Sequence, residues 1–139
     1  MASNLKKLVC KVFKEKGLNP PSDNDGVLTF ISMLSDGTKG TLHLSEADDG
    51  YSTVWCSNAL QTMLPIDELA WLRAANRHDL VGMAGEVEGL HYGMASLRIR
   101  PRDGAELTRD LLTFLTRLGM AVEDFRKAVS ASPTETSPG

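Results

Sequence analysis

The sequence has few of the residues that usually build metal sites, disulfide frameworks and nucleophilic centres. Its 139 residues include two cysteines, Cys10 and Cys56, and three histidines. No histidine lies at metal-ligand spacing from another histidine or from a cysteine, and there is no CxxC pair. We therefore expect reduced cysteines that pack as small apolar residues, and we expect neither a metal ion nor another cofactor.

The sequence also lacks a long apolar run and an excess of basic residues. Between Leu5 and Lys14, apolar residues are interleaved with lysines, whereas a secretory signal or a membrane-spanning helix needs a continuous apolar segment. A net charge of −3 and an isoelectric point near 5.6 argue against a generic binder of nucleic acids or anionic membranes. We expect a cytoplasmic protein without a nucleic-acid or membrane partner.

Hydrophobic residues make up 42% of the chain, which is enough to build one core in a chain of this length. We therefore expect a single domain over residues 1–130. Residues 131–139 (ASPTETSPG) are small, polar and contain prolines, so they are predicted to form a disordered tail.

The first half of the chain predicts a helix and three strands. Apolar residues at helical spacing indicate a helix near the start, with Ser3 as its N-cap and Gly17 as its stop. Residues 18–26 contain two prolines and several Asx residues, which predicts a loop. Residues 27–34 are nearly all apolar, which predicts a strand that is covered on both faces or lies at an interface. Further strands are expected at residues 40–44 and 51–57, completing an antiparallel meander.

The second half predicts a helix, a hairpin and a long closing helix. Pro65 opens the first of these helices, which ends near residues 76–79. Strands are expected at residues 81–88 and 94–100, around a turn at residues 89–93. The inner face of the helix is predicted to consist of Ile66, Leu69, Ala70 and Leu72.

The closing helix carries the strongest periodic signal in the chain. Asp103 and Glu106 have the spacing of a capping box at its start. Apolar residues then recur every three or four positions from Leu107 to Val129. Gly119 interrupts this pattern, which indicates a bend or a close contact, because glycine costs about 1 kcal/mol relative to alanine inside a helix.

The element order, α-β-β-β-α-β-β-α, predicts an α+β fold with a mostly antiparallel five-stranded sheet flanked by helices. This order resembles the type III secretion chaperone-like fold, which is shared by the Tir-chaperone families and the YbjN-like bacterial proteins. The first half agrees in element order only. The segments that are similar to the helix, the hairpin and the closing helix of these families are 64–76 (LPIDELAWLRAAN), 85–99 (GEVEGLHYGMASLRI) and 106–125 (ELTRDLLTFLTRLGMAVEDF).

The resemblance implies a small, acidic, usually dimeric cytoplasmic bacterial protein with no catalytic residues. Secretion chaperones of this shape bind an extended segment of an effector protein, and YbjN-like members act in regulation or stress response. We therefore expect a non-catalytic homodimer that binds an extended segment of a partner protein. The alternative is a regulatory protein that works through folded partner contacts.

A third hypothesis is a small enzyme or ligand-binding protein with a pocket near Trp55, Cys56 and His78. No base lies close to Cys56 in the sequence, which favours a packing role for this residue. The histidines are isolated, with His43 on the exposed side of its strand and His91 near the end of an element. We therefore predict that the protein is not an enzyme.

Apolar residues with no evident role in a single core are the candidates for partner binding. Leu112 and Met120 broaden the apolar face of the closing helix beyond what one packing face requires. Surplus apolar surface of this kind becomes an interface in a dimer or a complex. The candidate apolar contacts are Phe30, Ile31, Trp55, Leu112 and Met120.

Arg98 and Arg100 complete the set of candidate binding residues. With Arg102 they form a basic stripe that can hold the acidic groups of a partner. The alternative is a solvated strand face, on which the arginines pair with Glu86 and Glu88 of the neighbouring strand.

Overall fold

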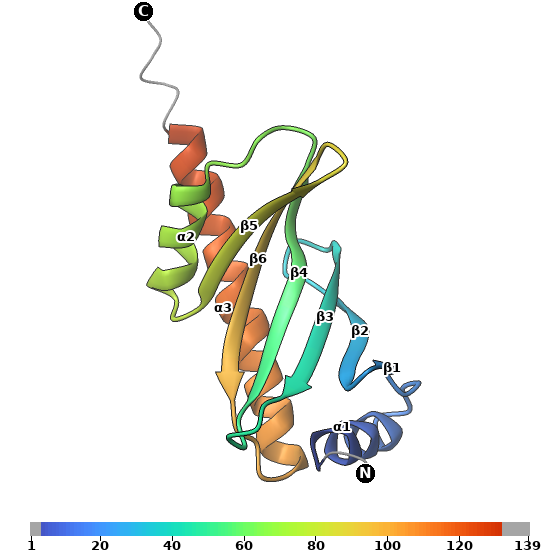
Figure 1. Ribbon diagram of the computed structural model, residues 1–139. Coiled ribbons are helices and arrows are strands. Elements are labelled where there is room, and N and C mark those ends of the chain that lie inside the picture. Colours follow the sequence, from blue (N-terminus) through green and yellow to red (C-terminus); the bar gives the residue numbers. More distant parts are fainter. Residues whose placement is uncertain (1–3, 132–139) are drawn as a thin grey trace, which may run out of the picture.

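Three helices and six strands follow one another along residues 4–131, the part of the chain that the computed structural model describes (Figure 1). The predicted order of elements is found, with one additional strand near the start. Ser3 and residues 132–139 lie outside the described residues, whereas Ala131 is the last residue of the final helix. The elements are α1 (Asn4–Glu15), β1 (Ser22–Asn24), β2 (Val27–Met33), β3 (Lys39–Glu46), β4 (Ser52–Thr62), α2 (Glu68–Arg77), β5 (Val81–Val87), β6 (Leu90–Ile99) and α3 (Gly104–Ala131).

The strands form one antiparallel sheet in the order β1-β2-β3-β4-β6-β5. The predicted α+β class and the meander of β2, β3 and β4 are confirmed, but the expected number of five strands is wrong. β4 continues past its predicted end at residue 57, through an irregularity between Cys56 and Leu60. β5 pairs only with β6, which makes it an edge strand of the sheet.

Two tight turns account for the additional strand and for the early start of β6. β1 pairs with β2 across a turn at Asp25 and Gly26, whose φ values are 54° and 87°. Residues 18–26 are therefore not all loop, because an Asp-Gly pair with positive φ closes a two-residue hairpin. In the same way, Glu88 and Gly89 form the turn between β5 and β6. β6 consequently begins at Leu90, four residues before its predicted start.

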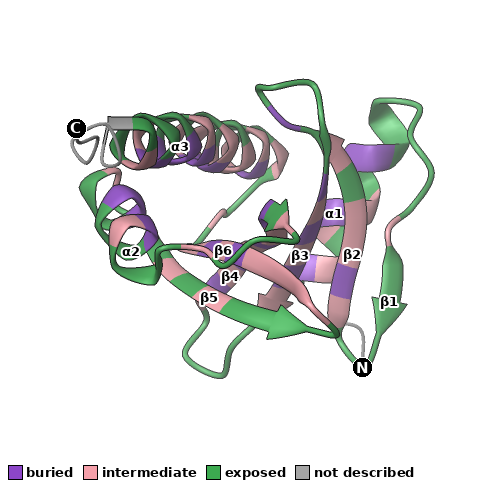
Figure 2. Ribbon diagram, turned by 90° about the horizontal axis from the view of Figure 1, so that it is seen from above, coloured by how far each residue is buried: buried purple, intermediate pink, exposed green. Residues whose placement is uncertain are grey.

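All three helices pack on one face of the sheet, the inner face, and Figure 2 shows α2 and α3 side by side there. Phe13 of α1 contacts Phe30 of β2 edge to face, with ring centroids 5.0 Å apart. Trp71 of α2 contacts Phe125 of α3 in the same manner at 5.9 Å. One hydrophobic core therefore connects the helices with alternate strand residues, among them Leu28, Leu42, Leu44, Val54, Cys56, Ala95 and Ile99.

The helix α2 begins later than predicted. Asp67 is its N-cap, and the Asp67 carboxylate accepts a hydrogen bond of 3.1 Å from the backbone N–H of Ala70. The first helical residue is therefore Glu68, and Pro65 lies three residues before it. This capping geometry satisfies one of the free N–H groups at the helix start.

The buried face of α2 matches the predicted one only in part, since Ile66 and Ala70 pack against the core. Trp71, Ala74 and Ala75 are buried, whereas Leu69 and Leu72 are exposed. The small alanines allow the helix to lie close to β5, where a Cβ added to Gly82 would come within 3.0 Å of the Ala75 side chain. The close approach of α2 to β5 therefore favours alanine at the buried positions. Leu72 lies beside this contact, and Leu69 is exposed.

The start of α3 is capped, but in a different way from the predicted capping box. The Asp103 carboxylate accepts a hydrogen bond from the Glu106 backbone N–H at 2.9 Å, as expected for an N-cap. The Glu106 carboxylate, however, accepts from the backbone N–H of Arg102 at 2.9 Å and not from that of Asp103. The apolar stripe that follows is core, with Leu107, Phe114 and other members buried as predicted.

Candidate functional site

The face of the sheet opposite the helices, the outer face, carries exposed apolar side chains. On β2, Ile31 and Met33 are 66% and 64% exposed. The expectation that this strand is covered on both faces is therefore wrong for the single chain, and its location at an interface remains a prediction. On β5, Val81, Met83 and Val87 are also exposed, at alternate positions of the edge strand.

A pocket of about 280 Å³ lies on the outer face where β4, β6 and β5 run side by side; we call it the edge pocket. Trp55 of β4 and Met94 of β6 line it together with Val81 and Met83 of β5. Met83 and Met94 are directly opposite each other in the strand register. Methionine side chains adapt to ligands of varied shape, so the pocket suits an apolar side chain without strict selection among them.

Trp55 is held in place by its neighbour on β3. Its ring stacks on the ring of His43, with centroids 5.1 Å apart. The two ring nitrogens of His43 lie 3.0 Å from the hydroxyl oxygens of Thr29 and Ser57. Burial lowers the pKa of His43, which keeps the imidazole neutral near pH 7. Trp55 therefore forms a rigid wall of the edge pocket.

The arginine stripe does not have the arrangement expected from the sequence. Arg98 forms an ion pair with Asp49, in the turn between β3 and β4, and its guanidinium lies 4.2 Å from the centre of the Tyr51 ring. Arg100 approaches the same ring, at 5.1 Å. The predicted pairing of these arginines with Glu86 and Glu88 is wrong, because the register places Glu86 opposite His91 at the other end of β6.

Arg102 lies outside the strand and binds Glu106 at the start of α3, at 2.7 Å. Arg98 and Arg100 therefore pack on the ring of Tyr51, whereas Arg102 takes part in the interactions at the start of α3. Arg98 and Arg100 keep exposed guanidinium groups beside the outer face.

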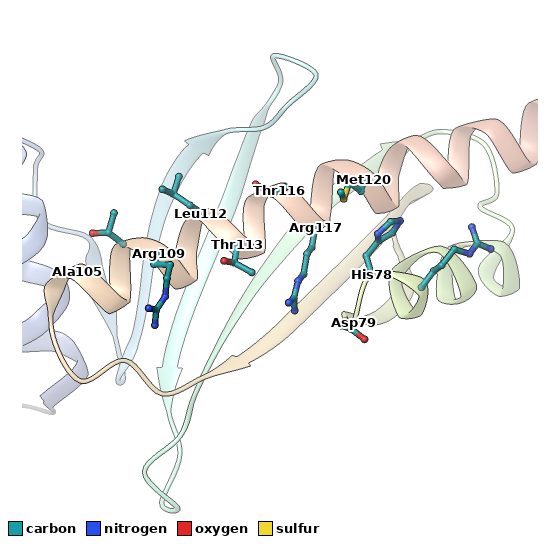
Figure 3. A pocket seen from close by; sticks show the side chains of 11 residues that line it. His78, Asp79, Ala105, Arg109, Leu112, Thr113, Thr116, Arg117 and Met120 are labelled. Carbon is teal, nitrogen blue, oxygen red and sulfur yellow. The ribbon is translucent and has the colours of Figure 1, made fainter.

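Leu112 and Met120 lie on α3 and face away from the core, at 58% and 45% exposure. They line a shallow groove of about 710 Å³ along the helix, which we call the α3 groove (Figure 3). Arg109 and Arg117 line the same groove, and residues 77–79 at the end of α2 close it. The groove lies on the helical side of the sheet, and thus on a different side of the molecule from the edge pocket.

The seven candidate residues therefore lie in separate places. Ile31, Trp55 and Arg98 are on the outer face, with Arg100 just beyond the end of β6. Phe30 has the opposite orientation from Ile31 and packs against Phe13 under the sheet, so it is only partly accessible.

Sequence reasoning missed the edge-strand residues Val81, Met83 and Val87 and their neighbour Met94. A signal for Val81 and Met83 exists in residues 81–84, where valine and methionine alternate with glycine and alanine. Such an alternation indicates a strand with one large apolar face, but it does not say whether that face is covered.

The predicted arrangement of Trp55, Cys56 and His78 around one pocket is not found. Trp55 and Cys56 are adjacent in a strand and point to opposite faces, and Cys56 is fully buried. Burial raises the pKa of the Cys56 thiol, which disfavours the reactive thiolate. His78 lies at the end of α2, where its Nε2 is 2.6 Å from the Asp124 carboxylate. Residues 4–131 hold no group of three or more His, Cys, Asp or Glu side chains placed to bind a metal ion.

Comparisons with known proteins find a similarity among solved structures. No model of a protein family matches the chain, and a search of curated proteins gives no match. Among solved structures, the chain is similar to the type III secretion chaperone SycH of Yersinia pestis, determined in complex with a stable fragment of YscM2. The match covers 81% of this chain and 95% of that chain, with 14% sequence identity and a TM-score of 0.47. A likeness this distant transfers neither residues nor partner to this chain.

No helix within residues 4–131 is long and apolar enough to cross a bilayer.

Proposed function

We propose that this chain is a non-catalytic protein-binding protein that holds an extended segment of a partner protein, as the secretion chaperones it resembles in element order do. One observation carries the proposal: the edge strand β5 and the edge pocket together form an uncovered apolar surface with free backbone groups beside it. An extended segment can form hydrogen bonds with the free backbone groups of β5 and place an apolar side chain on the apolar surface.

The backbone of β5 supports the choice of an extended partner. β5 has a neighbouring strand on one side only, so the other side presents N–H and C=O groups without a ladder partner. An added strand satisfies these groups through main-chain hydrogen bonds, which give affinity for many sequences. Side chains at alternate positions of that strand then point toward the outer face.

The edge pocket supports a preference for apolar side chains in the partner. Its wall is rigid at Trp55 and adaptable at Met83 and Met94. Arg98 and Arg100 lie farther along β6 and at its end, where an acidic group that follows the apolar side chain can reach a guanidinium. The expected ligand is therefore an extended segment with alternating apolar residues and a nearby carboxylate.

The test replaces a residue of the edge pocket and follows partner binding. Tagged wild-type protein, Met83→Lys and the matched control Met63→Lys are used to capture partners from the source cell, followed by quantitative mass spectrometry. Met63 is 70% exposed but lies in the loop after β4, outside the pocket. We expect Met83→Lys to lose a partner that Met63→Lys retains, because a charge in the pocket is costly to desolvate.

Limited proteolysis of the captured complex then identifies what is bound. Protection of a short segment that is unstructured in the free partner supports the proposal. Equal capture by Met83→Lys and wild type contradicts it.

The alternative is a regulatory protein that acts through folded partner contacts. The exposed α3 groove favours it, because a helical surface accepts a folded partner more readily than an extended one. A captured partner that remains protease-resistant on its own, and whose binding is unaffected by Met83→Lys, would establish this alternative.

A further inference from the structure

The α3 groove contains two parallel rows of side chains with different chemistry. Leu112, Thr116 and Met120 form one row at a spacing of four residues, and Arg109, Thr113 and Arg117 form the other. Figure 3 shows Arg109 and Arg117 pointing to the same side of α3. From residue 105 to residue 120 the lined part of the helix is about 22 Å long, at 1.5 Å per residue. Within this length the two rows run side by side for about two turns, one with Leu112 and Met120 at its ends and the other with Arg109 and Arg117.

Arginines outnumber carboxylates among the residues that line the groove. Three arginines line it, against the single carboxylate of Asp79. Arg117 is half-buried and has no ion-pair partner among the described residues, and Arg109 lies 3.9 Å from Asp110, its neighbour in sequence. Arg77 shares the carboxylate of Asp124 with His78. The guanidinium groups of Arg109 and Arg117 are therefore available to the carboxylates of an acidic partner.

The backbone of α3 indicates which conformation that partner has. In a helix the N–H and C=O groups of the interior are bonded to each other, so the groove offers no main-chain partners to an extended segment. An extended segment here would leave its own backbone unpaired where it is covered. In a helical partner the backbone N–H and C=O groups are already hydrogen-bonded to each other. Such a helix can pack its side chains into the groove, with apolar residues three and four positions apart as anchors.

We propose that the α3 groove binds an acidic amphipathic helix of a partner protein. Its apolar row packs against Leu112 and Met120, and an adjacent row of glutamate or aspartate residues pairs with Arg109 and Arg117. This site is independent of the edge pocket, because it lies on the helical side of the sheet and recognises a different conformation.

The binding test uses a labelled model helix and fluorescence anisotropy. The acidic probe has leucines at helical spacing with glutamates beside them, and the control probe has lysines in place of the glutamates. We expect the full-length protein to bind the acidic probe and not the lysine probe. Affinity should fall as salt rises from about 50 to about 300 mM, because partly exposed ion pairs are screened.

The variant Arg109→Glu/Arg117→Glu tests the arginine row. We expect it to bind the acidic probe about tenfold more weakly or worse, which corresponds to about 1.4 kcal/mol, and to bind the lysine probe instead. Arg73→Glu is the matched control, because Arg73 is exposed on α2 and does not line the groove. If the double variant does not fold by circular dichroism, Arg109→Gln/Arg117→Gln replaces it, with a smaller loss expected.

Three results would overturn the proposal. The first is equal binding of the acidic and lysine probes, and the second is an equal loss of affinity in Arg73→Glu. The third is wild-type self-association that Leu112→Asp abolishes, since this result would assign the α3 groove to a second copy of the chain.

Discussion

Gly119 lies inside α3 because the helix passes very close to the loop after β2. A Cβ added at this position would lie 2.4 Å from Ser35 Oγ and 3.1 Å from Ser35 Cβ. The close contact expected at this glycine is therefore present. Packing between α3 and the loop thus offsets the lower helix propensity of glycine.

The steric argument at Gly119 predicts how two substitutions couple. Gly119→Ala alone should yield little or no stabilisation, because the new methyl group meets Ser35. In a Ser35→Gly background the same change should stabilise the protein by about 1 kcal/mol, the full difference in helix propensity. Urea unfolding of the four proteins in a double-mutant cycle measures this coupling. Additive effects would show that the contact with Ser35 is not what requires glycine.

Glu106 predicts a pH dependence of stability. Hydrogen bonds from the guanidinium and the backbone N–H of Arg102 lower the pKa of Glu106 from its ordinary value of 4.5 to about 2. A carboxylate with a lowered pKa in the folded state stabilises the protein above pH 4.5, and this contribution disappears as the pH falls to about 2.

We expect Glu106→Gln to flatten the decline of the thermal midpoint between pH 4.5 and pH 2. Arg102→Gln should flatten it as well, because it removes the guanidinium that holds the carboxylate ionised. The midpoints are measured by circular dichroism at constant ionic strength. An unchanged slope in both variants would assign the decline to the other carboxylates with lowered pKa, such as Asp124 and Asp36.

At the scale of elements, Trp71 joins α2 to both the sheet and α3. Trp71 is fully buried, and its Nε1 donates a hydrogen bond of 2.9 Å to the Met94 carbonyl of β6. Its ring also contacts Phe125 of α3. The same residue therefore connects α2, the sheet and α3, close to the strand that lines the edge pocket.

Trp71→Phe should lower the free energy of unfolding by about 1–3 kcal/mol, because it removes the hydrogen bond and part of a packed ring. Hydrogen exchange should show earlier opening of α2 than of α3. Trp55→Phe is the control, since Trp55 is only partly buried on the outer face and should change stability less. An effect of Trp55→Phe as large as that of Trp71→Phe would contradict this ranking.

At the scale of the whole molecule, the two candidate surfaces lie on different sides and offer different groups. The edge strand β5 presents backbone groups beside an apolar pocket, and the α3 groove presents side chains alone. The two proposed ligands, an extended segment and a helix, would therefore not compete for the same surface.

The predicted homodimer is a further proposal at this scale. Leu69 and Leu72 lie one turn apart on α2 and are exposed, so they are available for contact with a second copy. We expect sedimentation to show a dimer that Leu69→Asp dissociates, with a thermal midpoint that depends on protein concentration. Leu18→Asp is the control, because Leu18 is exposed at a distant loop. A strictly monomeric wild type at high micromolar concentration would refute the dimer.

Much of the architecture could be predicted from local patterns. The repeat of apolar residues in α3 and the turns at Asp36-Gly37 and Asp48-Asp49-Gly50 depend on residues near one another in sequence. The buried face of α2 could not be predicted from the leucines, because Ala74 and Ala75 are selected by their approach to β5. The ion pair of Arg98 with Asp49 likewise joins residues that are 49 positions apart.

The sequence by itself determined the order of the three helices and of five of the six strands, the α+β class and the lack of metal-ligand spacing. These properties follow from periodicity, turn residues and composition, which act over a few positions of the chain. Only the tertiary structure decided which apolar residues are covered, because burial depends on what packs on each face. The tertiary structure also places all three helices on one side of the sheet. That arrangement leaves the edge pocket and the α3 groove open, and these two surfaces carry the functional proposals.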